Sequence, residues 1–335
     1  TNTSKSILEL DYNNTYGSIF HNYNKNTDWV DAINRFGKEH HYYLTLSGGG
    51  EKATFRVSGG YYTQSGQIIK QQLDRFTTRM ALDYYVSDRI RVSSDFSLTY
   101  TDNDQNYTGL LNSAQLIMPN MAVNRYEKDG TMTDDYMQMM NNANAIFDNN
   151  QKNIKNPIAV AKYAKNNEET YSITPQLTLE YNLLGLEDDE TQLKYRAMVN
   201  MNANTFTETS YLPSSLTTTQ WTNDQINKSY MKDYKSLQFT TRHNLIFTPH
   251  FNNEDHFLTM TAQYELYSGS SSEQRETTYG LPSGNTTSPT LGSKLSDAGT
   301  STGQWRSMSL AYQSHYSYKS KYSLGFTLRA EGNTK

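Results

Sequence analysis

Histidines and acidic clusters are the residues that could bind metal or perform acid–base chemistry. The sequence has seven histidines and no cysteine, and no histidine stands in the paired spacing of a zinc site. His40 and His41 are adjacent, so on a strand they point to opposite faces and do not chelate one ion. Residues 187–190 read Glu-Asp-Asp-Glu, but they lack the spacing of a calcium loop and fit a solvated turn. We predict no metal, no cofactor and no enzymatic activity.

Aromatic side chains are the second group of candidate functional residues, because they can stack on sugar rings. The chain has 27 Tyr, 12 Phe and 3 Trp. Trp221 lies in a predicted loop, and Trp305 begins a predicted strand. Each could contact a substrate or anchor the protein at a membrane interface. The same alternatives hold for three tyrosines of a long predicted loop, so the candidate substrate-binding residues are Trp221, Trp305, Tyr107, Tyr126 and Tyr136.

The charge balance and the hydrophobic and aromatic content indicate which class of protein this is. Charge is nearly balanced, with 30 Lys and Arg against 34 Asp and Glu, which argues against a nucleic-acid partner. Only 35% of residues are hydrophobic, yet 13% are aromatic. That combination is typical of an outer-membrane barrel with a watery lumen, a thin lipid-facing band and aromatic girdles. There is no run of 18 apolar residues, so no transmembrane helix is predicted.

Period-two alternation is the main structural signal. In residues 53–61, apolar side chains such as Phe55 and Val57 alternate with polar ones such as Arg56. The clearest alternating stretches run to about 9 to 14 residues, which is long for a soluble sandwich and suits a tilted membrane strand. About ten strands are expected, at 42–47, 53–61, 76–86, 90–100, 172–181, 193–202, 237–247, 258–266, 306–318 and 322–329. The predicted fold is an all-β transmembrane antiparallel barrel segment.

Arginines recur on the polar face of these strands, which the barrel interpretation assigns to the lumen. The predicted lumen-lining residues are Arg56, Arg79, Arg91, Arg196 and Arg242. They could hydrogen-bond a polar substrate, but they more often pair with carboxylates. The carboxylates expected on the same face are Asp83, Asp95, Glu180 and Glu265.

The connections between strands alternate in length. The long ones are 64–74, 102–168, 206–234 and 268–304. Barrels have short periplasmic turns and long extracellular loops, so we expect the long set outside the cell. Residues 110–117 predict a short helix in the longest loop. The chain divides into a segment 1–39 that leads into the wall and the strands and loops of 40–335.

Several motifs in a fixed order resemble one family. They are TDWVDAI (27–33), YLTLSGG (43–49), ATFRVSGGY (53–61), QSGQII (64–69), RFTTR (75–79) and, near the end, YSYKSKYSLGFTLRAEG (316–332). This series resembles the early barrel and a later hairpin of SusC-like (RagA-type) TonB-dependent transporters of Bacteroidetes. The resemblance covers residues 27–105 and 305–333 most clearly.

The resemblance implies a 22-stranded outer-membrane barrel with a plug domain. It also implies a SusD-like surface lipoprotein as a lid, and import of oligosaccharides or peptides driven by the TonB complex through the plug. No plug or second half of the barrel is found in these 335 residues. Since ten strands alone leave two open edges that lipid forbids, we expect an internal fragment. Two alternatives stay open: a self-contained ten-stranded outer-membrane hydrolase, and a surface adhesin.

Overall fold

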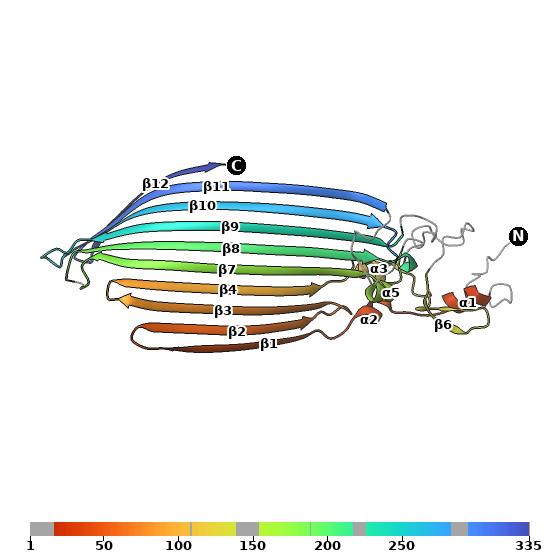
Figure 1. Cartoon of the computed structure of the whole chain (residues 1–335). Helices are drawn as coiled ribbons and strands as arrows, with labels where there is room; N and C mark the ends of the chain where they lie inside the picture. The colour runs from red at the N-terminus through yellow and green to blue at the C-terminus, as the bar shows by residue number, and fades with distance from the viewer. Residues whose placement is uncertain are drawn as a thin grey trace.

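A long antiparallel sheet and a small folded region at one of its ends make up the molecule (Figure 1). The computed structural model describes residues 17–107, 109–138, 154–187, 189–216, 226–282 and 294–334. The helices gather at the end of the sheet that we call the cap end. The opposite end holds the short strand connections and is called the turn end.

The sheet pairs its strands in chain order, each antiparallel to the next, as β1-β2-β3-β4-β7-β8-β9-β10-β11-β12. The bounds are β1 Lys38–Gly49, β2 Ala53–Ser65, β3 Gln72–Ser87, β4 Ile90–Asp104, β7 Lys165–Leu184, β8 Gln192–Leu212, β9 Lys228–Thr248, β10 His256–Tyr279, β11 Lys294–Tyr318 and β12 Tyr322–Thr334. This arrangement, together with the comparisons below, confirms the predicted antiparallel barrel segment of about ten strands.

The strand register carries the sequence alternation across the whole sheet, because directly paired residues share a face. One row of partners is apolar and runs Leu46, Val57, Met80 and Phe96 across β1 to β4. The neighbouring row lies on the opposite face and runs Ser47, Arg56, Ala81, Asp95, Gln176, Asn200 and Thr240. We call these two surfaces the apolar face and the charged face.

Aromatic side chains form a row on the apolar face near the cap end. Five consecutive register partners are Tyr42, Tyr61, Phe76, Tyr100 and Tyr171, and the rings of the last two lie 4.6 Å apart. Nearer the turn end, Tyr195 Oη and His243 Nδ1 lie 2.7 Å apart within another ring cluster. Aromatic belts of this kind mark the edges of a bilayer.

The apolar face has no second layer packed on it in the described part of the chain. Leu44 on β1 is 76% exposed and Leu324 on β12 is 69% exposed. Such a surface is costly in water and suits contact with lipid. The strands β1 and β12 also each have one unpaired edge in the described sheet.

Strands β7 to β11 are longer than predicted, at 20 to 25 residues. They therefore extend into the predicted loops 206–234 and 268–304: β8 continues to Leu212, β9 begins at Lys228, β10 continues to Tyr279 and β11 begins at Lys294. Likewise, β4 extends to Asp104 and β7 begins at Lys165, so both strands reach into the predicted loop 102–168. The prediction was wrong because most of the added strand residues are polar or charged on both faces, with only scattered apolar side chains, so they show no regular alternation.

The cap end carries the elements that we call the loop cap. They are α1 Gly17–Tyr23, α2 Trp29–Ile33, α3 Leu110–Leu116, the hairpin of β5 Asn124–Tyr126 and β6 Met132–Tyr136, and α5 Pro157–Tyr163. The helix predicted at 110–117 is confirmed as α3. Among the residues that the structure describes, no helix combines the length and the hydropathy needed to cross a bilayer.

A hydrophobic core holds the loop cap together. This core combines buried side chains from α1 and α2, from the stretch between α3 and the end of the β5–β6 hairpin, and from α5. Leu216 of the short 3-10 helix Ser214–Leu216 packs against them. Trp29 is 3% exposed, and its indole N–H donates to the carbonyl of Met118 at 3.0 Å. The described helices and hairpin of the longest predicted loop therefore pack into one core with α1 and α2.

Candidate functional site

Ion pairs cover the charged face of the sheet. Arg79 Nη2 lies 2.6 Å from Asp95 Oδ2, and Arg242 Nε donates to Glu265 at 2.6 Å. Both are cross-strand pairs, and both use carboxylates that the sequence analysis placed on the same face. Their side chains are partly exposed, so each pair contributes about 1 kcal/mol or less to stability.

A longer network crosses β3, β4, β7 and β8. Arg91 Nη2 lies 2.8 Å from Asp83 Oδ1, and its Nη1 lies 3.7 Å from Glu180 Oε2. Arg196 Nε approaches the other oxygen of Glu180 at 3.3 Å. Ser93 also donates its hydroxyl to Asp83. This network places alternating charges along the wall, where water can reach them.

Arg56 differs from the other four predicted arginines. No carboxylate pairs with it among the described residues, and it lines a shallow hollow of the charged face together with Tyr43 and Arg79. Its guanidinium is therefore open to an outside ligand. Whether these five arginines line a lumen stays a prediction.

Trp305 lies near the middle of β11 and on the charged face, where its register partner is Gly269 of β10. The prediction that it begins a strand was wrong. Residues 294–304, rich in Ser, Thr and Gly, pair with residues 270–279 of β10 and extend the strand before Trp305. Trp221 lies outside the described residues.

The three candidate tyrosines belong to the loop cap or its junction with the sheet. Tyr107 is half-buried there, and this burial raises the pKa of its phenol. Tyr126 lies under the Lys25 ammonium, 4.4 Å from the ring centre. Tyr136 packs edge-on against Tyr163, at 5.7 Å between ring centres. These rings stabilise the cap, and the structure does not bring them together with Trp305.

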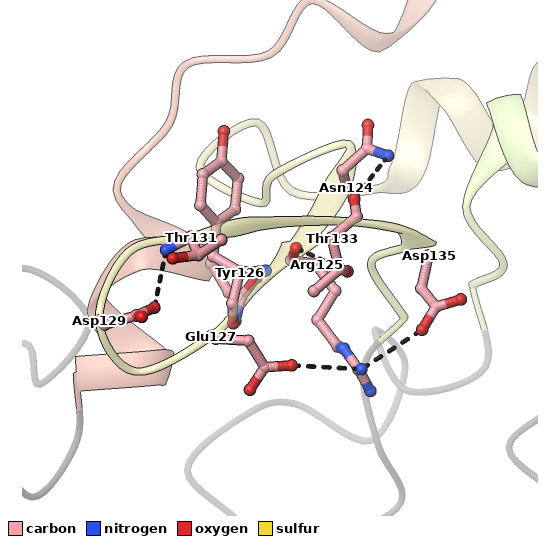
Figure 2. Close-up of polar contacts among 9 residues, drawn as sticks. Asn124, Arg125, Tyr126, Glu127, Asp129, Thr131, Thr133 and Asp135 are labelled. Carbon is pink, nitrogen blue, oxygen red and sulfur yellow. Dashed lines mark hydrogen bonds and ion pairs between the residues drawn. The ribbon is translucent and has the colours of Figure 1, made fainter.

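The β5–β6 hairpin presents a polar surface (Figure 2). Figure 2 shows Arg125 between two carboxylates, and its Nη2 lies 3.3 Å from both Glu127 Oε1 and Asp135 Oδ2. Asp129 accepts a hydrogen bond from the backbone N–H of Thr131 at 2.9 Å. This bond lowers the pKa of the Asp129 carboxyl.

Sequence reasoning missed two residues that position these surfaces. Asn156 is fully buried and makes four hydrogen bonds: its amide donates to the carbonyls of Val123 and Met137, and its oxygen caps α5 at Ile158 and Ala159. The Asn-Pro pair at 156–157 is a recognisable helix start. The other residue is Gly269, whose position inside a strand signals a close approach by another group.

In the described part of the chain, no three His, Asp or Glu side chains are close enough to share a metal ion. The described charged face is a polar surface of ion pairs, hydroxyls, amides and one indole.

Similar proteins were found by comparing both the sequence and the structure, and they are receptors and transporters of the TonB-dependent kind. No family model matches the chain. It is 30% identical over 146 residues to the TonB-dependent receptor P3 of Formosa agariphila, a match that covers 39% of this chain and 14% of that protein. The RagAB peptide transporter has a similar structure, with a TM-score of 0.68 and 16% identity over 93% of this chain and 34% of the other. Its closed-closed state gives a TM-score of 0.67 at the same identity, over 93% and 33%.

The chain has the barrel-wall fold of TonB-dependent transporters. It spans about a third of the length of the solved transporter that it matches. The resemblance identified from the sequence motifs and the predicted location in the outer membrane are both confirmed. The names of the similar proteins describe a receptor and a transporter, which agrees with the prediction that the chain is not an enzyme but does not test it.

Proposed function

We propose that the chain is part of the wall of a TonB-dependent outer-membrane importer that works with a SusD-like lid lipoprotein. The observation that carries this proposal is the similarity to the RagAB transporter over 93% of the chain. The two-faced sheet supports it, because one face suits lipid and the other suits water. The open edges of β1 and β12 also favour further strands, since a barrel in lipid has to close.

The cap end of the sheet faces outside the cell in this proposal. Consecutive strands are separated along the chain by at most seven residues at the turn end, whereas three of the four separations at the cap end are 14 residues or more. This difference follows the usual asymmetry of outer-membrane barrels. The loop cap then lies at the mouth of the barrel, where the lid would contact it. Its own hydrophobic core supports such a role, because a folded surface presents fixed contacts to a partner.

The proposed substrate is an oligosaccharide, and peptides are the alternative within the same function. Most charges of the charged face are already paired with one another, which leaves the wall polar but nearly neutral. A neutral, hydroxyl-rich substrate suits that wall. The similar solved structure is called a peptide transporter, so peptides belong in the test.

Uptake by living cells tests the function. A strain lacking the gene for the full-length protein is compared with its parent for uptake of fluorescent oligosaccharide and oligopeptide mixtures, with and without a protonophore. We expect the deletion to abolish energy-dependent uptake of one class. Equal uptake by the two strains for both classes would contradict the importer proposal. Re-expression of the intact gene is the control.

A further inference from the structure

We propose that Trp305 and the uncharged surface around it bind the ring of a neutral sugar on the charged face of the sheet. This inference rests on the proposed import function and adds a specific site to it. The site is a shallow binding surface on β8 to β11, away from the loop cap and from the ion-pair network of β3 to β8.

The indole of Trp305 lies directly over Gly269, in space that is free because glycine has no side chain. A Cβ atom built on Gly269 would overlap Cε2 and Cζ2 of the Trp305 ring. The ring therefore occupies the space that any other residue at position 269 would fill. Gly303, the next residue toward the cap end on the same face, adds no side chain beside the ring. Glycine inside a strand weakens the sheet, so two glycines at this ring argue for a use of the open space.

The register decides between the two roles considered for Trp305. An interface anchor has to lie on the apolar face, among rings such as Tyr264 and Tyr312. Trp305 lies on the opposite face, in the row of Gly269, Gln238 and Asn202. It is only half-buried, and its indole N–H has no acceptor among the described residues. The ring is thus open to a ligand from the charged face.

On β8 to β11, the described residues in the row of Trp305 and in the rows on either side carry no ionised group. The nearest charge on β12 is Glu331, which accepts a hydrogen bond from Ser307 at 3.4 Å and pairs with Arg329. On β8, β9 and β10 these rows supply amides and hydroxyls: Asn202, Gln238, Thr240, Ser236, Tyr267 and Ser271. The nearest charges on β10 are Glu265 and Glu273, four residues to either side of Gly269. Each already has a partner, Arg242 for the first and Lys232 for the second.

The indole, the amides and the hydroxyls together favour one class of ligand. The C–H face of a pyranose ring packs on an aromatic ring, while amides and hydroxyls exchange hydrogen bonds with its hydroxyl groups. Among the described residues, these rows offer no unpaired cation to a phosphate or a carboxylate. A peptide terminus would lose water without gaining an opposite charge. A neutral sugar therefore fits the surface best.

Binding to the purified full-length protein tests the site. The probes are four neutral hexasaccharides (maltohexaose, cellohexaose, xylohexaose and mannohexaose), a hexagalacturonate and a mixed hexapeptide, each titrated by calorimetry. We expect at least one neutral probe to bind, and Trp305→Ala to weaken it tenfold or more. Gly269→Ala should weaken it similarly, because the new methyl group displaces the ring.

The matched control is Gly325→Ala. Gly325 lies on the same face of β12, and a Cβ there meets nothing within 4 Å, so this variant should bind like the wild type. Heat-dependent migration on gels confirms that each variant is folded. The inference is overturned if no neutral probe binds the wild type, if the Trp305 and Gly269 variants bind it unchanged, or if they lose only the peptide. Trp305-dependent sugar binding without any cellular uptake would support the site and contradict the importer.

Discussion

The sheet and the loop cap differ in where their apolar side chains lie. In the sheet, large apolar residues such as Leu44 and Leu324 point outward and stay exposed. In the cap, Trp29, Ile33 and Met121 are almost completely buried against one another. The sheet relies on its backbone pairing and on surrounding lipid, whereas the cap has a core of its own. Substitutions should therefore act very differently in the two regions.

The largest effect is expected at the centre of the cap. Trp29→Ala removes a buried indole and its hydrogen bond to the Met118 carbonyl, which should cost about 4 kcal/mol. Limited proteolysis of the full-length protein should then cleave the cap rapidly while the sheet stays resistant. Phe36→Ala is the control, since Phe36 is 95% exposed. Equal protease resistance of the Trp29 variant and the wild type would contradict the cap core.

Asn156→Ala should have the next largest effect. The substitution leaves two buried carbonyls unsatisfied and uncaps α5, at a cost of about 3 kcal/mol. Hydrogen exchange should rise in β6 and α5. Asn253→Ala, which removes a turn hydrogen bond at the opposite end of the sheet, serves as the control. Exchange that rises equally in both variants would show that Asn156 does not connect the hairpin to the helix.

Charges of the wall should matter less for stability than buried groups of the cap. Glu180→Gln weakens the pairs with Arg91 and Arg196, but both are partly exposed, so about 1 kcal/mol or less is expected. The measurement is the urea midpoint of refolding into vesicles, with Glu39→Gln as a matched control on β1. A loss as large as that of Trp29→Ala would mean that the ion pairs, rather than backbone pairing, hold the wall.

The smallest expected effect is a pH dependence at the hairpin tip. The Thr131 N–H lowers the pKa of Asp129 below its ordinary value of 3.8, so its stabilising effect is complete above that value. The effect is lost as the pH falls through the lowered pKa. Thermal unfolding of the cap in wild type and Asp129→Asn should differ slightly at pH 6 and converge near pH 2. A difference that grows on acidification would contradict this sign.

Sequence patterns predicted the wall better than the cap. Alternation located the strands and placed Arg79, Arg91, Arg196 and Arg242 on the face of the carboxylates that they contact. Alternation missed the strand extensions near the cap end, because stretches that are mostly polar on both faces do not alternate. It also missed the cap core, whose helices of five to seven residues are too short for a helical period. Trp305 was wrongly predicted to begin a strand because the polar extension before it, residues 294–304, shows no alternation.

The intact mass of the polypeptide purified from its native outer membrane, with identification of co-purifying proteins, tests the central claim most directly. For the wall of an importer we expect a mass far above the 38.4 kDa of this chain and a lipoprotein in equal amount. A mass equal to this chain, with no partner, would contradict the importer wall and favour a self-contained ten-stranded barrel.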